Sequence, residues 1–520
     1  MSAVRVLAAL AVTSLLATGC GPTTTASSAP TAAALAAQAD AVPTPEIAWA
    51  PCAEPGLAGD DCARVPVPLD YARPDGPAVD LAVVRQRALD PAHRIGTLFT
   101  AAGGPGSSGI DWAAGGPMFP GVVSERFDVV TFDQRGIGRS AAVRCFADSQ
   151  AQQDFWLGLP IPPTDGSEEQ AVTDGSARFA EGCAEFGGDL IAHLTTADAA
   201  RDLELLRRAV GDPALTYEGG SYASYLGMTY GALFPDRVRA LHLSSIVDSE
   251  GYTLDTRADI ARTARGTEEV RVEFARLCAE AGVARCPFGG GSADHVLTRD
   301  TSLLEQSAAA PIQVGSGDTA ITVTHSQLVH AHAMLLYRPD QGWPALAALL
   351  SELAAGPDGD PEVVGQVLGA VTLTGDFLDS FVAISCADNA VGRHPHRWPE
   401  FAADSAAQSP FFGPFWLYLR QPCATWPMPE DGFPQRFPGP WRSSVPALLV
   451  NNRFDPATPL SGAERAAQAL GGARLVVVTD GYGHEPTGDC VTELRERYLV
   501  DLVVPAAGTT CTVDRLPFAD

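Results

Sequence analysis

The sequence contains no lysine, so all 35 basic side chains of this 520-residue chain are arginines. This absence excludes functions that need a lysine amine, namely the phosphate-loop lysine of nucleotide hydrolases, the kinase lysine and Schiff-base chemistry. Basic residues are also few beside the 62 acidic ones, and the net charge is −27 with neutral histidines. So acidic a chain is a poor partner for nucleic acids and anionic membrane surfaces. With 46% apolar and 19% charged residues, it has the composition of a folded globular protein.

The cysteines include no Cys-x-x-Cys pair, which removes support for a zinc ribbon or a thioredoxin-type redox site. Ten of the 11 cysteines remain when Cys20 is set aside, and an even number in an exported chain predicts five disulfides. The sequence leaves their connectivity open, and pairing of neighbours along the chain is our working hypothesis. It gives the pairs Cys52–Cys62, Cys145–Cys183, Cys278–Cys286, Cys386–Cys423 and Cys490–Cys511.

The first residues have the features of an export signal. Arg5 precedes a mainly apolar run, Val6–Ala17, which is too short to span a bilayer. Ala17-Thr18-Gly19-Cys20 follows, and the arrangement resembles a bacterial lipoprotein signal in which Cys20 is lipidated after cleavage. We therefore predict a signal peptide over 1–19 and an exported chain, either a cell-surface lipoprotein or a secreted protein. A simple secretory signal with an incidental Cys20 is the alternative to lipidation.

Beyond this signal, we expect a tether, a core in two parts and an insertion. Residues 20–48 are predicted to form a flexible tether, because they contain few large apolar side chains. From residue 49, β-rich runs alternate with helical stretches, the pattern of a mainly parallel sheet with helices on both faces. The core is expected at 49–248 and 441–520, interrupted after the sixth strand by a mainly helical lid over 249–440. The eight predicted strands are Val65–Leu69, Ala78–Gln86, Thr97–Ala101, Phe127–Phe132, Leu215–Glu218, Val238–Leu243, Ala447–Asn451 and Arg474–Val478.

A serine lies on the sharp turn between the fifth predicted strand and the helical stretch after it. The turn reads Gly219-Gly220-Ser221-Tyr222-Ala223, and a nucleophilic serine there needs very small residues two positions away on either side. Gly219 meets this need, and Ala223 differs from the usual second glycine by one methyl group. Alone the motif is weak, because an ordinary turn with Ser221 as a helix cap has the same pattern.

Three other loops add context to this serine. The third predicted strand runs into the glycine-dense segment Gly103–Gly109, where backbone N–H groups can reach a ligand oxygen. Asp455 follows a strand at the edge where α/β sheets bind ligands, and His484 lies in a glycine-rich loop after the last strand. Each has a simpler interpretation, as a turn, a helix cap or a solvated histidine. The order Ser221, Asp455, His484 is nevertheless the triad order of hydrolases built on such a sheet.

Five ordered motifs carry a family resemblance: Gly103-Gly104-Pro105-Gly106, Asp133-Gln134-Arg135-Gly136-Ile137-Gly138-Arg139-Ser140, Gly219-Gly220-Ser221-Tyr222-Ala223, Asp455-Pro456-Ala457-Thr458-Pro459 and Gly483-His484. Together they resemble the α/β-hydrolase family of secreted actinobacterial tripeptidyl aminopeptidases, which is related to prolyl aminopeptidases and has a TAP-like C-terminal segment. The resemblance spans Trp49 to Cys511 and implies the α/β-hydrolase fold.

The resemblance also implies roles for individual residues. Ser221 would be the nucleophile, Asp455 the acid and His484 the base. Gly104 would donate one oxyanion hydrogen bond, beside the backbone N–H of Tyr222, which follows the nucleophile. Two departures, Ala223 and the segment 244–248 in place of an Asp-Gly-Val-x-Asp pattern, bear on substrate preference more than on the triad.

We therefore expect an exported serine exopeptidase that hydrolyses peptide bonds near a free N-terminus through an acyl-enzyme and releases tripeptides. A carboxylate should bind the protonated substrate amine, and the candidates are Asp248, just past a strand end, and Asp388, in the insertion. A secreted carboxylesterase or amidase acting on small acyl substrates would use the same triad. A non-catalytic solute-binding lipoprotein would explain the anchor but not the triad order.

No cofactor and no metal are expected. His325, His330 and His332 are close in sequence, but positions 330 and 332 point to different faces of a helix, which disfavours a metal site. Arg135 is expected to brace the loops beneath the site rather than to touch substrate. The sequence leaves the oligomeric state open.

Overall fold

A computed structural model of the protein describes residues 31–389, 391–392, 394–427 and 446–519. The predicted signal peptide and Cys20 lie outside the described residues. Ten strands form one sheet, in the order β1-β2-β3-β5-β4-β6-β7-β10-β11-β12. They are β1 (Ala50–Pro51), β2 (Asp61–Pro68), β3 (Ala78–Gln86), β4 (Gly96–Thr100), β5 (Phe127–Phe132), β6 (Leu215–Gly220), β7 (Val238–Ser244), β10 (Leu448–Phe454), β11 (Arg474–Tyr482) and β12 (Thr510–Cys511).

All eight predicted strands are present, but the sheet has ten strands rather than eight. β1 and β12 are two residues long, and they lie at the two edges, so neither shows a periodic pattern in the sequence. Every pairing from β5 across to β12 is parallel, whereas β1, β2, β3 and β5 pair antiparallel. The mainly parallel α/β-hydrolase arrangement is therefore confirmed.

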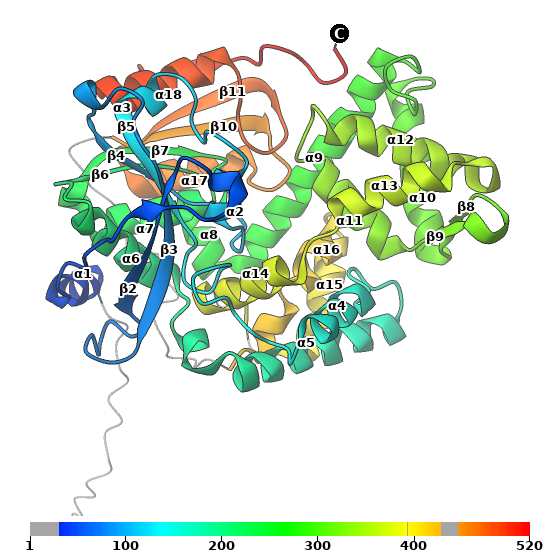
Figure 1. Cartoon of the computed structure of the whole chain (residues 1–520). Coiled ribbons are helices and arrows are strands. Elements are labelled where there is room, and N and C mark those ends of the chain that lie inside the picture. The colour runs from blue at the N-terminus through cyan, green and yellow to red at the C-terminus, as the bar shows by residue number, and fades with distance from the viewer. Residues whose placement is uncertain (1–30, 390, 393, 428–445, 520) are drawn as a thin grey trace, which may run out of the picture.

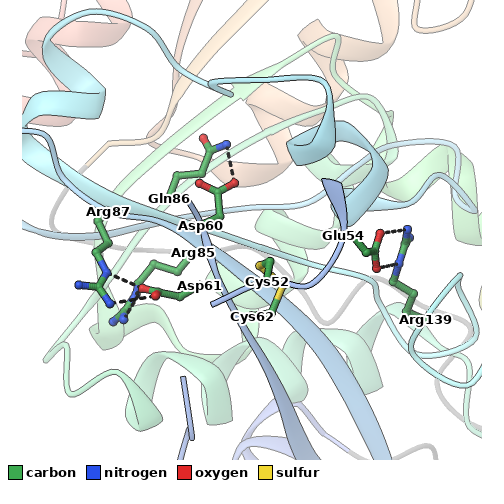
Figure 2. The surroundings of a disulfide bond; sticks show 9 residues. All are labelled: Cys52, Glu54, Asp60, Asp61, Cys62, Arg85, Gln86, Arg87 and Arg139. Atoms are coloured by element: carbon green, nitrogen blue, oxygen red, sulfur yellow. Dashed lines mark hydrogen bonds and ion pairs between the residues drawn. A yellow bond between two sulfur atoms is a disulfide. The ribbon is translucent and has the colours of Figure 1, made fainter. Parts of the chain in front are cut away.

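The antiparallel edge of the sheet is tied together by covalent and ionic links (Figure 2). The Cys52–Cys62 disulfide joins the chain after β1 to β2. Beside it, the Asp61 carboxylate accepts hydrogen bonds from Arg85 at 2.7 Å and from Arg87 at 2.5 Å. These links fix the short edge strand, which its own two residue pairs would hold only weakly.

Alternate side chains of the strands pack on opposite faces of the sheet. On β5, Phe127 and Val129 belong to one core, whereas Val130 and Phe132 belong to the other. Because both faces of the sheet are covered, the parallel strands have apolar side chains on both sides and therefore appear in the sequence as nearly continuous apolar runs. The first face carries α2 (Gly109–Ala114), α3 (Val122–Arg126) and α18 (Asp489–Asp501), and the second carries α1 (Ala32–Ala41), α6 (Thr196–Ala209), α7 (Tyr222–Leu233) and α17 (Leu460–Leu470).

Part of the predicted tether is a folded helix. α1 buries Leu35 and Ala39 in the main core. Arg208 donates hydrogen bonds to the carbonyls of Ala39 at 3.0 Å and Val42 at 2.7 Å. The prediction of a flexible tether is thus wrong for residues 32–42, because an alanine-rich helix with one leucine offers no hydrophobic period to detect.

The insertion between β7 and β10 lies beside the sheet as a second, helical body (Figure 1). Its helices enclose a core of their own, in which Phe274 packs against the buried Trp343. Two helices that precede β6, α4 (Ser149–Gly158) and α5 (Gly166–Phe186), pack against this body. The insertion contains α8 (Ser249–Leu254), α9 (Thr256–Ala281), α10 (Ala293–Ala309), β8 (Ile312–Val314), β9 (Ile321–Val323), α11 (His325–Leu335), α12 (Gly342–Ala355), α13 (Pro361–Val371), α14 (Gly375–Asp388), α15 (Trp398–Ala406) and α16 (Phe412–Tyr418).

All five disulfides join the cysteines that neighbour pairing predicted. Within the described ranges, no single helix has both the length and the apolar character needed to cross a membrane. Only α13 and α14, as a pair bent by 42°, meet that test.

Candidate active site

Ser221 lies between β6 and α7 in the conformation expected of a strained strand-to-helix turn. Its backbone has φ 56° and ψ −132°, a region that L-residues rarely adopt, and its N–H donates to the carbonyl of Ser244 at 3.1 Å. The neighbours two positions away are as small as the turn requires. A Cβ atom on Gly219 would lie 2.8 Å from the carbonyl oxygen of Ala223, and the methyl group of Ala223 is itself fully buried.

Asp455 and His484 form a direct pair. Nδ1 of His484 is 3.0 Å from both carboxylate oxygens of Asp455. The same carboxylate accepts hydrogen bonds from the N–H groups of Ala457 and Thr458 and from the Thr458 hydroxyl, at 2.8 to 2.9 Å. Burial alone would lower the pKa of His484, but the charge and hydrogen bond of Asp455 outweigh it and raise that pKa above its ordinary value.

The loop of His484 lies against the turn of Ser221. The carboxylate of Glu485 is so close to Gly220 that a Cβ atom there would meet it at 2.4 Å, and it accepts a hydrogen bond from the Ser244 hydroxyl at 2.9 Å. Nε2 of His484 is buried and has no hydrogen-bond partner among the described residues. The nitrogen that would take the serine proton is therefore unengaged, a common state before substrate binds.

The glycine-dense loop after β4 also contacts the serine. A Cβ atom on Gly103 would lie 3.0 Å from Cβ and 3.3 Å from Oγ of Ser221. Gly104 has φ +111° and precedes a cis proline, and it lines the same cavity as Ser221 and Tyr222. The structure therefore brings both predicted oxyanion donors to the nucleophile's cavity.

The insertion contacts both loops of the Asp455–His484 pair. The carbonyl of Tyr337, between α11 and α12, accepts the backbone N–H of His484 at 2.8 Å, and the two rings are 4.8 Å apart. On α9, the Thr267 hydroxyl donates to the carbonyl of Pro456 at 2.7 Å. The core supplies the pair, and the insertion fixes its position.

Neither predicted amine-binding carboxylate is free. Asp248 lines the cavity, but its Oδ2 is 2.7 Å from both Arg262 and Arg465, and its Oδ1 caps α8. Asp388 lies on α14 and accepts hydrogen bonds from the N–H and hydroxyl of Thr196, at 2.7 and 2.6 Å. The Thr196 hydroxyl in turn forms a hydrogen bond with the Tyr222 hydroxyl at 2.5 Å, so Asp388 is linked to the side chain of Tyr222 through Thr196.

Two charged residues of the cavity had no signal in the sequence. Asp259, in the first turns of α9, lines the cavity, and among the described residues its one ion-pair partner is Arg262, at 3.3 Å. Burial, followed by the charge of Asp248, raises the pKa of Asp259 to about 7. Arg420, just after α16, lines the same cavity. Only the folded arrangement of α9 and α16 distinguishes these two from the other acids and arginines of the chain.

The remaining residues considered in the sequence, Arg135 and the three histidines, have hydrogen-bond partners within the fold. Arg135 is fully buried and bonds Asp202 at 2.6 Å as well as the carbonyls of Pro68, Leu69 and His193, which is the expected brace. The three histidines face different partners. His325 bonds Ser307, His330 bonds the carbonyl of Val371, and His332 bonds Asp300.

Comparison with known proteins shows the family to which this chain belongs. Residues 97–277 match the family described as alpha/beta hydrolase fold, and residues 409–511 match the family described as TAP-like protein. The tripeptidyl aminopeptidase of Streptomyces coelicolor is 30% identical over 505 residues, which cover 91% of this chain and 88% of that protein. Serine protease Hip1 of Mycobacterium tuberculosis is 30% identical, covering 89% and 91%, and carboxylesterase B of the same species is 29% identical, covering 86% of each chain. The chain therefore belongs to the tripeptidyl aminopeptidase family of α/β-hydrolases and is a serine aminopeptidase-like hydrolase.

Proposed function

We propose that the protein is an exported serine exopeptidase that cleaves peptide bonds near the free N-terminus of peptides and releases tripeptides. The observation that carries this proposal is the contact of His484 Nδ1 with both oxygens of Asp455 at 3.0 Å, next to a serine in a strained strand-to-helix turn. Export is supported by the five disulfides, which persist in oxidising compartments. Lipidation of Cys20 would add a membrane anchor.

The proposed mechanism assigns one role to each group. His484, kept in one tautomer by Asp455, takes the proton of Ser221 while Oγ attacks the substrate carbonyl. The same imidazolium then gives its proton to the leaving amine, and water releases the acyl-enzyme. The backbone N–H groups of Gly104 and Tyr222 would bind the oxyanion, each with about 3 kcal/mol of transition-state stabilisation.

The restriction to a free N-terminus is supported by the cavity beside Ser221. The insertion supplies much of its lining, including Asp259, Tyr337 and Trp416. Of the cavity carboxylates, Asp259 is the better partner for a substrate amine, because Asp248 is already paired with two arginines. An ammonium group beside Asp259 would also draw that carboxyl into its charged form.

The product pattern tests the proposal directly. A ladder of unblocked peptides of increasing length, incubated with the enzyme, should lose successive N-terminal tripeptides, which mass spectrometry would identify. Internal cuts at early times would instead indicate an endopeptidase. A fluorophosphonate probe should label wild-type protein at Ser221, and an absence of labelling would exclude the serine mechanism.

The substrate amine gives a sharper prediction. Acetylating it should lower kcat/KM by at least ~30-fold, because the partly buried carboxylate of Asp259 loses the ammonium group as a partner. Asp259→Asn should reproduce that loss for free-amine peptides and leave the acetylated ones unchanged. The control is Glu280→Gln, which is exposed near the far end of the same helix and should change neither rate.

The second candidate, a carboxylesterase or amidase, has one observation in its favour, the 29% identity to carboxylesterase B. It uses the same triad but needs no amine-binding carboxylate. Equal rates for free and acetylated peptides, together with faster turnover of small esters, would establish this alternative and reject the exopeptidase.

A further inference from the structure

Arg420 is the unpaired arginine of the Ser221 cavity. The other arginine that lines it, Arg262, is within 3.3 Å of Asp259 and 2.7 Å of Asp248. Arg420 has no ion pair among the described residues, and its Nη1 is buried without a hydrogen-bond partner there. Its guanidinium lies 4.5 Å over the ring of Phe381, so one face is covered and the N–H edge is left for a partner.

An arginine without an ion-pair partner in a cavity lowers the stability of the fold unless a ligand supplies that partner. Arg420 is partly buried, and its Nη1 is the nitrogen that is withdrawn from water without a partner among the described residues. Guanidinium nitrogens in that position are usually paired, because transfer of an unpaired charge out of water is unfavourable. Burial lowers the pKa of Arg420 below its ordinary value, while Tyr252, Asp259 and Asp388 oppose this shift electrostatically. The missing partner is an acceptor with two oxygens, since the planar N–H fork of arginine matches a carboxylate.

The position of Arg420 limits where that carboxylate can belong. Gly104, Ser221 and Tyr222 line the same cavity, and in the proposed mechanism they would surround the carbonyl that the serine attacks. His484, which would protonate the leaving amine, lines a separate cavity with Arg338 and Glu485. Because Arg420 shares its cavity with the expected oxyanion donors and not with His484 itself, the arrangement favours the acyl part of the substrate, rather than the departing peptide, as the partner of Arg420.

We propose that Arg420 binds a carboxylate in the acyl part of the substrate, so that the enzyme prefers peptides with Asp or Glu among the residues released from the N-terminus. The inference rests on the serine hydrolase function proposed above and adds a substrate class to it. Asp259 and Arg420 then complement a released fragment that has a positive amine and a negative side chain.

Matched peptides test this assignment. A set of tripeptides with a chromogenic leaving group should contain Glu or Gln at each of the three positions in turn, with everything else identical. For the wild type, we expect kcat/KM to be at least ~10-fold higher for Glu than for Gln at one position. In Arg420→Gln this ratio should fall to about one, and Arg420→Lys should retain part of it. Because a ratio is compared, any general loss of activity cancels.

The matched control is Arg397→Gln. Arg397 also lies over a phenylalanine ring, that of Phe401 at 4.9 Å, but it is paired with Glu400 at 2.9 Å on the surface, so its loss should leave the Glu/Gln ratio unchanged. An absence of Glu preference in the wild type at all three positions would overturn the proposal, and this result needs no variant to fold. A preference that survives in Arg420→Gln would overturn it as well.

The outcome is separable from that of the proposed function. If the enzyme hydrolyses esters but no peptides, the exopeptidase proposal fails. Arg420 is then tested with an acyl ester that has a terminal carboxylate, beside its neutral methyl ester. Equal rates for these two esters would reject the role of Arg420, whatever the leaving group.

Discussion

Ser221 combines an unusual backbone conformation with the position from which a nucleophile would act. Ser221→Ala should lower kcat by at least ~10³-fold while the protein stays folded, because binding and the oxyanion donors remain. Steady-state kinetics and thermal unfolding of the purified variant check this. The control is Ser302→Ala on the exposed side of α10, which should behave as wild type. Asp455→Asn or His484→Ala, combined with Ser221→Ala, should add little further loss, and near-wild-type turnover of Ser221→Ala would contradict the assignment.

The raised pKa of His484 predicts the pH dependence of the enzyme. His484 acts as a base only when neutral, so kcat/KM should fall as the pH drops through its pKa, and this acidic limb should lie above the ordinary histidine value of 6.5. Asp455→Asn removes the charge that raises the pKa and leaves the burial that lowers it. The limb should then move to lower pH as kcat falls, whereas Asp294→Asn, on the exposed surface of α10, should leave the profile in place. A limb unmoved in Asp455→Asn would contradict this account.

The contact between Asp455 and His484 and the strained turn at Ser221 agree with what the sequence indicates, whereas the charged residues that line the cavity could not be predicted from it. Ser221, Asp455 and His484 each follow a strand in a loop of small residues, so sequence order and local composition are enough to indicate them. The same reasoning from a strand end predicts Asp248 as an amine-binding carboxylate, but two arginines already pair with it. Asp259 lies on an ordinary helical stretch, and only the packing of α9 over the cavity gives it a role.

At the scale of elements, α9 packs so closely against the loop of Asp455 that adding one methyl group to Gly266 should disturb the contact. A Cβ atom at Gly266 would lie 2.4 Å from the ring of Pro459 and 3.1 Å from the carbonyl of Asp455. Gly266→Ala should therefore displace the loop and lower both kcat and the melting temperature, although alanine favours a helix by about 1 kcal/mol. Gly369→Ala on α13, where a Cβ meets nothing within 4 Å, should be neutral or stabilising. Equal effects of the two substitutions would show that this contact does not matter.

Three elements, β1, β12 and α1, are not predicted from the sequence. The strands β2 to β7, β10 and β11 contain apolar runs that are long enough to be recognised in the sequence. β1 and β12 have only two residues each, which is too short for such a run. α1 is stabilised by its partners more than by its own sequence, since Leu35 and Ala39 are buried in the main core. Such long-range contacts leave no local pattern in the chain.

For the whole molecule, the disulfide framework makes a countable prediction. Mature protein, denatured without reductant, should show no free thiol apart from Cys20, because the other ten cysteines are paired. Thiol titration with a chromogenic disulfide measures this, and prior reduction, as the control, should expose all ten. Two or more thiols per unreduced chain would contradict the framework. Reduction should also destabilise the fold, since each bridge contributes roughly 2–4 kcal/mol.

The hydrogen bond from the backbone of His484 to Tyr337 also limits how the molecule can move. The interface between the sheet and the insertion includes His484 itself. The contact is tight, because a Cβ atom on the neighbouring Gly483 would lie 2.5 Å from the Tyr337 carbonyl oxygen. A rigid-body rotation of the insertion away from the sheet would break the hydrogen bond between His484 and Tyr337 and displace His484. Opening the cavity in that way should therefore also abolish activity. If His484 is the base, we therefore expect substrate to enter by local movement of side chains, and a form with the insertion swung away from the sheet should be inactive.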